Sequence, residues 1–160
     1  MVTAEAFVEK YSAGFLSTLA SELDAINKND RLINSCMAST TCFARQYRLL
    51  QSREFQRVFS NTQCKSADQL LTILAASNDC DHARLGLAIS KKRIKSAVAR
   101  NQLKRLVRDS FRRHQNELQN IDIIVIGHTR AAQVSNQEIL DCLNQHWKNL
   151  AARCKNLSSL

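Results

Sequence analysis

The chain has 160 residues, of which 44% are hydrophobic and 23% charged, and a formal net charge of +9. This composition is typical of a single soluble globular domain, long enough to bury a compact core. No apolar run approaches the ~20 residues that a transmembrane helix needs, and the N-terminus lacks the pattern of a signal peptide. We therefore expect a cytoplasmic protein without a membrane partner.

The positive charge is concentrated in one segment. Residues 84–113 carry eleven Lys and Arg residues against Asp109 alone, a net charge of +10, and all other residues sum to −1. A solvated surface usually mixes both signs, because like charges repel. One basic stripe on a near-neutral body therefore indicates a polyanionic partner, either nucleic acid or an acidic membrane.

The N-terminal part differs from the rest of the chain. Residues 1–41 carry a net charge of −2, and their apolar side chains recur at three- or four-residue steps from Phe7 to Ile26. This spacing predicts a helix over about residues 4–26, followed by a polar linker. We predict that residues 1–42 are an added extension, that residues 43–153 form the core domain, and that residues 154–160 are a C-terminal tail.

The core domain is expected to alternate helices and strands in a small α/β (α+β) fold. Capping residues and hydrophobic periodicity place the boundaries. The patterns predict, in chain order, a helix over 52–60 capped by Ser52, strands over 70–76 and 84–90, a helix over 96–118, a strand over 121–127, and a helix from Ser135 to about 152.

Six cysteines and four histidines could suggest disulfides, a metal or catalysis. The cysteines form no C-x-x-C pair, and no histidine lies at zinc-finger spacing from two of them. In a cytoplasmic chain we expect reduced thiols, with a structural metal as the alternative. The histidines lack a suitably spaced nucleophile or ligand and are expected on the surface. These residues are Cys36, Cys42, Cys64, Cys80, Cys142, Cys154, His82, His114, His128 and His146.

The predicted helix over 96–118 is amphipathic. On a helical wheel its core-facing stripe consists of Ala99, Leu103, Leu106, Val107, Ser110 and Phe111. One flank carries Asn101, Lys104, Arg105, Arg108 and Arg112. Like charges one turn apart destabilise an isolated helix by roughly a few tenths of a kcal/mol per pair. Several such pairs without acidic partners favour an external anion over a merely solvated face.

DNA recognition is a competing use of such a helix. A helix-turn-helix motif would need a second short helix immediately upstream, but a strand-like segment and the basic run KKRIK precede the helix here. RNA fits better, because it offers phosphates and 2′-hydroxyls over an irregular surface.

The stretch RLGLAISKKRIKSAVARNQLKRLVRDSFRR, residues 84–113, resembles the signature of the bacterial ribonuclease P protein family. That signature is a strand ending in a basic pair, a short connection, and R-N-x-x-K-R-x-x-R with an aromatic residue three positions on. Residues 43–59 resemble the family's first helix, and residues 122–150 resemble its last strand and helix. The resemblance implies a ribonuclease P protein-like, ribosomal protein S5 domain 2-like sandwich with a left-handed βαβ crossover. Pattern alone predicts the common right-handed one.

The resemblance also implies a function in tRNA processing. The protein would be a subunit of an endoribonuclease that removes the 5′ leader of precursor tRNA by hydrolysing one phosphodiester bond. Chemistry is expected on a catalytic RNA and its Mg²⁺ ions, and the protein is expected to carry no catalytic residue and to bind neither metal nor DNA by itself. The sequence agrees, because Asp79 and Asp81 lie in a predicted turn and no carboxylate cluster suits two-metal hydrolysis. The alternatives are a plain RNA-binding or assembly protein and a self-sufficient nuclease.

Two groups of site residues follow from the resemblance. Phe55 and Phe59 match an aromatic pair that lines a cleft for the single-stranded leader, where stacking contributes roughly 1–3 kcal/mol per base. Ordinary core packing is the alternative for both. Gln102 stands where the family usually has arginine, so a phosphate contact there is expected to be weakened or lost. The residues expected to contact the catalytic RNA are Lys91, Lys92, Arg100, Asn101, Lys104, Arg105 and Arg108.

Overall fold

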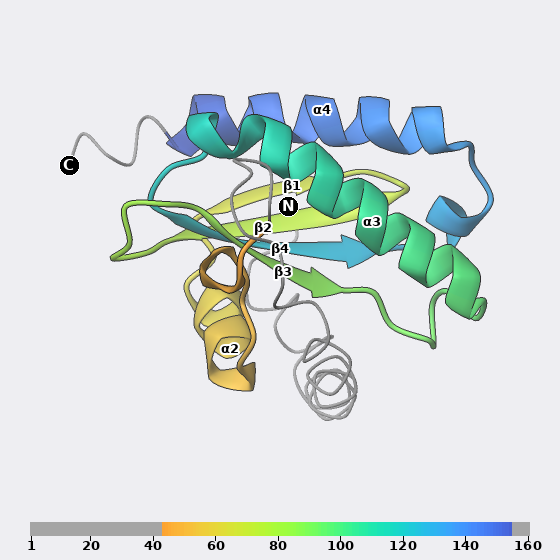
Figure 1. Cartoon of the computed structure of the whole chain (residues 1–160), viewed down its shortest axis with the longest axis horizontal. Helices are drawn as coiled ribbons and strands as arrows, with labels where there is room; N and C mark the ends of the chain where they lie inside the picture. Colours follow the sequence, from red (N-terminus) through yellow and green to blue (C-terminus); the bar gives the residue numbers. More distant parts are fainter. Residues whose placement is uncertain (1–42, 155–160) are drawn as a thin grey trace, which may run out of the picture.

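The structure is a computed structural model that describes residues 43–154 (Figure 1). A four-stranded sheet with the strand order β1-β2-β4-β3 lies between helices α3 and α4 on one face and α2 on the other. The bounds are α2 Ser52–Ser60, β1 Cys64–Ala67, β2 Leu71–Ser77, β3 Arg84–Ala88, α3 Ala97–His114, β4 Ile121–Gly127 and α4 Asn136–Cys154. Short 3-10 helices span Arg45–Tyr47, Gln115–Glu117 and Thr129–Ala132.

The central strands are covered on both faces. β2 pairs with both β1 and β4 in antiparallel fashion, with Ile73 opposite Val125, while β3 runs parallel to β4 with Gly86 opposite Ile124. All seven residues of β4 are buried. A strand buried on both faces has no polar side, which is why it reads as a continuous apolar run rather than an alternation.

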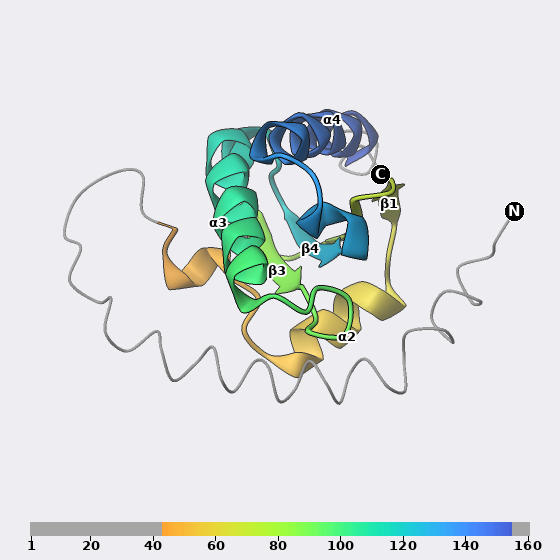
Figure 2. The ribbon, with the colours of Figure 1, turned by 90° about the vertical axis from the view of Figure 1, so that its right-hand side faces the viewer.

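The connection from β3 through α3 to β4 is left-handed. In Figure 2 the ends of β3 and β4 point toward the viewer, β3 lies to the lower left of β4, and α3 lies to the left of both, on the upper-left side of the sheet where α4 also packs. This is the arrangement that the family resemblance implies. Pattern alone predicted the opposite hand, which is found in nearly all such connections.

Most predicted boundaries are confirmed within two residues. The strand over 121–127 and the helix over 52–60 have the predicted bounds, and Ser96 caps α3 by accepting a hydrogen bond from the Ala99 amide. Ser52 is not the cap of α2, because Gln51 holds that position and forms a capping box with Glu54. The strand β1 was missed, since its four residues, CKSA, are too few and too polar to show a pattern.

Two hydrophobic clusters lie on the two faces of the sheet. The larger one joins the sheet to α3 and α4, and the predicted core stripe of α3 is confirmed in it. Phe111 and Trp147 meet edge to face there, and the Trp147 indole donates a 2.8 Å hydrogen bond to the Ser110 hydroxyl. The smaller cluster lies under α2.

Some predictions fall outside the described residues. These are the helix over 4–26, the linker, the tail and the state of Cys36, Cys42 and the Cys154 side chain. Within residues 43–154, Cys64, Cys80 and Cys142 are thiols rather than disulfides, as predicted. No helix in this part of the chain is long and apolar enough to cross a bilayer.

Candidate nucleic-acid interface

The basic flank of α3 is the centre of the candidate interface. Of its residues, Asn101, Arg105 and Arg112 are exposed, and Lys104 and Arg108 are half-buried, as is the neighbouring Arg100. The opposite, apolar side of the helix lies in the core through Leu103, Val107 and Phe111. The flank therefore presents cations at one-turn spacing on a rigid helix.

The single acidic residue of α3, Asp109, neutralises cations at the C-terminal end of this flank. Asp109 pairs with Arg112 at 2.5 Å and also with Arg113, so the C-terminal turn neutralises part of its own charge. The hydrogen bond from Arg112, opposed by burial and reinforced by Arg113, lowers the pKa of Asp109. On the N-terminal side of Asp109, residues 97–108 of α3 contain no acidic residue.

The connection into α3 is held by backbone contacts. Ile94 is 1% exposed, and its amide donates to the Ser90 carbonyl at 3.1 Å. The guanidinium of Arg100 donates to the carbonyls of Ile94 and Lys95 at 3.0 and 2.9 Å. Arg100 thus fixes the start of the helix relative to the connection as well as carrying charge.

The connection also contains Arg93, whose guanidinium binds a histidine side chain of the protein. Arg93 donates a 2.6 Å hydrogen bond to Nδ1 of His128, and the opposite ring nitrogen lies 2.8 Å from the Thr72 hydroxyl. A guanidinium only donates, so His128 accepts through Nδ1 and its Nε2–H donates to Thr72. Burial, and then the Arg93 charge, lower the pKa of His128 and keep its ring neutral. The neighbouring lysines, 91 and 92, are exposed.

Gln102 has a specific partner. Its amide donates a 2.8 Å hydrogen bond to Oδ1 of Asn136, the first residue of α4. The N-terminus of a helix carries partial positive charge, so an arginine side chain would meet a less favourable field there than the neutral amide does. The departure from the family's arginine therefore has a local structural counterpart.

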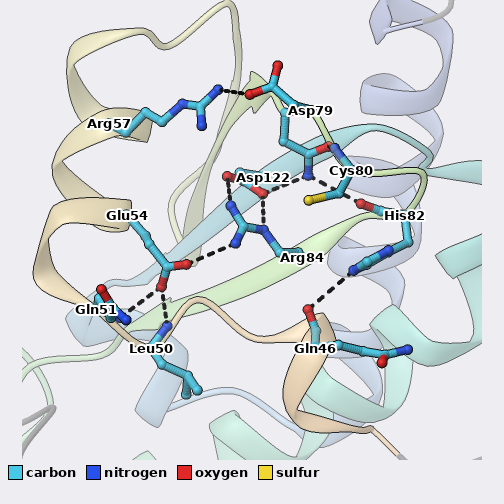
Figure 3. A network of polar contacts seen from close by, with 11 residues as sticks. Gln46, Leu50, Gln51, Glu54, Arg57, Asp79, Cys80, His82, Arg84 and Asp122 are labelled. Atoms are coloured by element: carbon cyan, nitrogen blue, oxygen red, sulfur yellow. Dashed lines mark hydrogen bonds and ion pairs between the residues drawn. The ribbon is translucent and has the colours of Figure 1, made fainter.

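Arg84 does not belong to the basic surface, although it lies in the basic segment. It binds both carboxylate oxygens of Asp122, at 2.8 and 2.6 Å, and Glu54 of α2 at 2.9 Å (Figure 3). The hydrogen bond with Asp122 is the main reason why the pKa of Arg84 is raised. Asp122 is 1% exposed and also accepts a 2.7 Å hydrogen bond from Asn78.

This network fixes α2 on the sheet. One oxygen of Glu54 binds Arg84 and the other accepts the amides of Leu50 and Gln51 at 2.8 Å each. At the other end of the network, Arg57 pairs with Asp79 at 3.0 Å, so Asp79 has a partner that the sequence did not reveal.

The two predicted leader-binding phenylalanines have different environments. Phe55 is 1% exposed, and a Cβ on Gly86 would come within 2.8 Å of its ring. Its ring therefore packs against β3 in the core, which is the alternative predicted for it. Phe59 is half-buried at the edge of the same cluster. Of the pair, Phe59 is the ring that reaches solvent.

The predicted RNA-contacting and leader-contacting groups lie on opposite faces of the sheet. α3 is on one face and α2 on the other, and both border the edge strand β3 (Figures 1 and 2). A nucleic acid that touched both would have to pass around this edge.

The prediction that the histidines lie on the surface is wrong for His146, which is 4% exposed on α4. His82, His114 and His128 are half-buried, and each makes a hydrogen bond. The sequence analysis missed these roles because the partners are distant in the chain, except for the Ser110 carbonyl that His114 contacts one turn away.

Comparison with known proteins gives a consistent result. The family model described as Ribonuclease P matches residues 43–151. The ribonuclease P protein component of Pseudoalteromonas atlantica is 46% identical over 113 residues, covering 71% of this chain and 93% of its own length. That of Vibrio cholerae is 44% identical over 113 residues, covering 71% and 95%.

Solved structures agree with the sequence relatives. The RNase P protein of Staphylococcus aureus has a TM-score of 0.58 at 32% identity, with 62% of this chain and 90% of that chain covered. The Thermotoga maritima RNase P protein has a TM-score of 0.57 at 28% identity, with 63% and 94% covered.

Proposed function

This chain belongs to the ribonuclease P protein family, and from that premise we propose that it is the protein subunit of a ribonuclease P ribonucleoprotein. In this proposal it binds a catalytic RNA and the 5′ leader of precursor tRNA, and it assists endonucleolytic removal of the leader. The observation that carries the proposal is the flank of α3 between residues 97 and 108, where cations recur at one-turn spacing without an acidic residue.

The α3 flank suits a phosphate backbone. Each lysine or arginine that neutralises a phosphate releases condensed counterions, so binding weakens as salt rises. Arg105 and Asn101 are exposed, and Asn101 adds an amide that can bind a phosphate or a 2′-hydroxyl. Lys91 and Lys92 extend the basic surface beyond the helix. We assign the catalytic-RNA contact to these two regions, with Arg100 positioning one against the other.

Phe59 is our candidate for the leader contact. It lies on α2, away from the face that carries α3, so leader and catalytic RNA would occupy different faces. Stacking on an aromatic ring is tolerant of base identity, as a subunit that accepts many leaders requires. Phe55 supports this contact from below by fixing α2 on β3.

The proposal places hydrolysis, and the Mg²⁺ ions that it uses, on the RNA subunit. Hard cations such as Mg²⁺ prefer oxygen ligands, and two-metal hydrolysis needs several of them together. Within residues 43–154, Asp122, Asp109 and Asp79 are each paired with arginine. The cluster of possible metal ligands found there contains a single carboxylate.

A reconstitution experiment tests the proposal. Precursor tRNA is incubated with purified full-length protein alone, with a ribonuclease P RNA alone, and with both, at a low Mg²⁺ concentration. We expect correct 5′ cleavage only when both are present. Cleavage at the correct site by RNA-free protein would assign the chemistry to the protein. Tight RNA binding without any stimulation of cleavage would favour the alternative, an RNA-binding protein with no processing role.

A further inference from the structure

A cluster of three different metal-ligand types lies outside the basic flank of α3, on α4 and the turn before β2. Asp68 is in the turn between β1 and β2, and Cys142 and His146 are one turn apart on α4. One ligand atom from each of the three lies within 4.8 Å of the other two. Neither the family match nor the proposed function assigns a role to this group.

The carboxylate of Asp68 is oriented toward the cluster. Its Oδ1 accepts the backbone amides of Leu70 and Leu71, both at 2.7 Å, which fixes the side chain in the turn. Its Oδ2 lies 2.6 Å from the sulfur of Cys142 and 3.3 Å from Nε2 of His146. Burial works against ionisation, but the hydrogen bonds from Cys142 and the two amides outweigh it and lower the pKa of Asp68.

The imidazole ring of His146 is buried, and one of its nitrogens faces the cluster. The residue is 4% exposed, and its buried Nε2 lies 3.3 Å from the Asp68 carboxylate but outside hydrogen-bond geometry. Its Nδ1 lies 2.7 Å from the hydroxyl of Ser66, a buried residue of β1. Buried polar atoms are rarely left without a partner, so an unpaired nitrogen aimed at a thiol and a carboxylate calls for an explanation.

We propose that Asp68, Cys142 and His146 form a binding site for a divalent transition-metal ion, Zn²⁺ above all. Sulfur, imidazole nitrogen and carboxylate oxygen are the three ligand types that Zn²⁺ takes in proteins. Nδ1–H of His146 donates to Ser66, which leaves the Nε2 lone pair for the ion and orients the ring. Binding displaces the thiol proton of Cys142, so the carboxylate and the thiolate together balance the charge of the ion.

The surroundings select against Mg²⁺. Asp68 also lines an open surface pocket with Gln69, Arg93, His128, Thr129 and Arg130, which gives an ion access from solvent. The two arginines repel a free cation, so affinity has to come from bonds to sulfur and nitrogen. Mg²⁺ prefers oxygen ligands, whereas Zn²⁺ binds thiolate and imidazole strongly.

A catalytic use of the same residues is not supported by their protonation. Burial and the hydrogen bond to Asp68 raise the pKa of Cys142, so without a metal the group is a thiol and not the nucleophilic thiolate. Burial lowers the pKa of His146, so its ring is neutral and available as a ligand. The site would instead link the β1–β2 turn to α4 and stabilise the edge of the sheet.

Cobalt substitution tests the site directly. The full-length, untagged protein is stripped with chelator and titrated with Co²⁺, and the thiolate-to-cobalt absorption band is recorded. We expect the wild-type band to be lost in Cys142→Ser and kept in Cys80→Ser, the matched control. Ser66→Ala should weaken Co²⁺ binding by roughly 10- to 100-fold, as losses of such supporting hydrogen bonds do.

The stability readout covers variants that fold less well. At a hundredfold excess over its dissociation constant, Zn²⁺ should raise the unfolding temperature of the wild type by about 10 °C, and excess Mg²⁺ should not. The metal-induced shift is compared within each variant, including Asp68→Asn, so a general loss of stability cancels. A band that persists in Cys142→Ser, or the absence of both band and shift in the wild type, would overturn the proposal. Neither result depends on ribonuclease P activity.

Discussion

The two faces of the sheet are covered in different ways. On one face α3 and α4 enclose a large apolar cluster that includes Phe111 and Trp147. On the other face the nine-residue helix α2 covers a smaller cluster around Phe55 and is held by a charge network in which the half-buried Glu54 and Arg84 join the buried Asp122.

This difference bears on how each face carries function. Apolar burial on the α3 side is extensive enough for the helix to display like charges, each of which costs some stability. The α2 side has less apolar area and depends on a charge network, so its stability is more sensitive to the loss of a single partner. The α3 face presents cations on a helix anchored in the larger apolar cluster. The α2 face is covered by one short helix, with Phe59 half-buried at the edge of its cluster.

The largest expected effect comes from breaking the network under α2. Arg84→Met leaves Asp122 buried without its counter-charge and should lower the free energy of unfolding by about 3–5 kcal/mol, measured by urea denaturation. Arg57→Met, which removes an exposed pair, should cost about 0–1 kcal/mol. The double variant Arg84→Met/Asp122→Asn should recover part of the loss. Equal costs for the two single variants would show that the network does not hold α2.

A second pair of variants separates packing from binding on the α2 face. Phe55→Leu should lower the free energy of unfolding by about 1 kcal/mol, because a smaller side chain replaces a buried ring. Phe59→Leu should cost less stability but weaken precursor-tRNA binding to the reconstituted complex by about 1–3 kcal/mol. Mature tRNA, which lacks a leader, is the control. Equal weakening for both tRNAs would remove Phe59 from the leader contact.

On the opposite face, the salt dependence of RNA binding measures the charge contacts. Lys104→Ala/Arg108→Ala should reduce the log–log salt slope by roughly 1.4–1.8, which corresponds to two lost phosphate contacts. The charge-matched control Lys148→Ala/Arg153→Ala removes two cations from α4 and should leave the slope nearly unchanged. Equal slopes in both variants would mean that only net charge matters.

The smallest effect is expected at Gln102. Gln102→Arg adds a cation to the flank but breaks the hydrogen bond to Asn136 at the start of α4. The salt slope for RNA binding should therefore rise by less than the roughly 0.7–0.9 of a full phosphate contact. An increase of the slope by the full amount, roughly 0.7–0.9, would show that the introduced arginine side chain no longer contacts α4 and binds a phosphate. An unchanged slope would show that this position faces away from the RNA.

Local sequence patterns determined much of the fold and the position of the candidate interface. The bounds of the β4 strand, the Ser96 cap and the core stripe of α3 each depend on residues within a few positions of one another. Hydrophobic periodicity and capping chemistry report such short-range relations directly. The basic flank was visible for the same reason, since its cations lie one helical turn apart.

Only the tertiary structure decided the rest. It paired Arg84 with Asp122, 38 residues away, and so neutralised one cation of the basic segment 84–113. It buried Phe55 on Gly86, and it brought His146 to Ser66, 80 residues away, beside Cys142 and Asp68. The left-handed crossover belongs to the same class, because the order and hand of strands depend on how whole layers pack. Contacts between distant residues leave no periodicity in the chain, so a single sequence cannot reveal them.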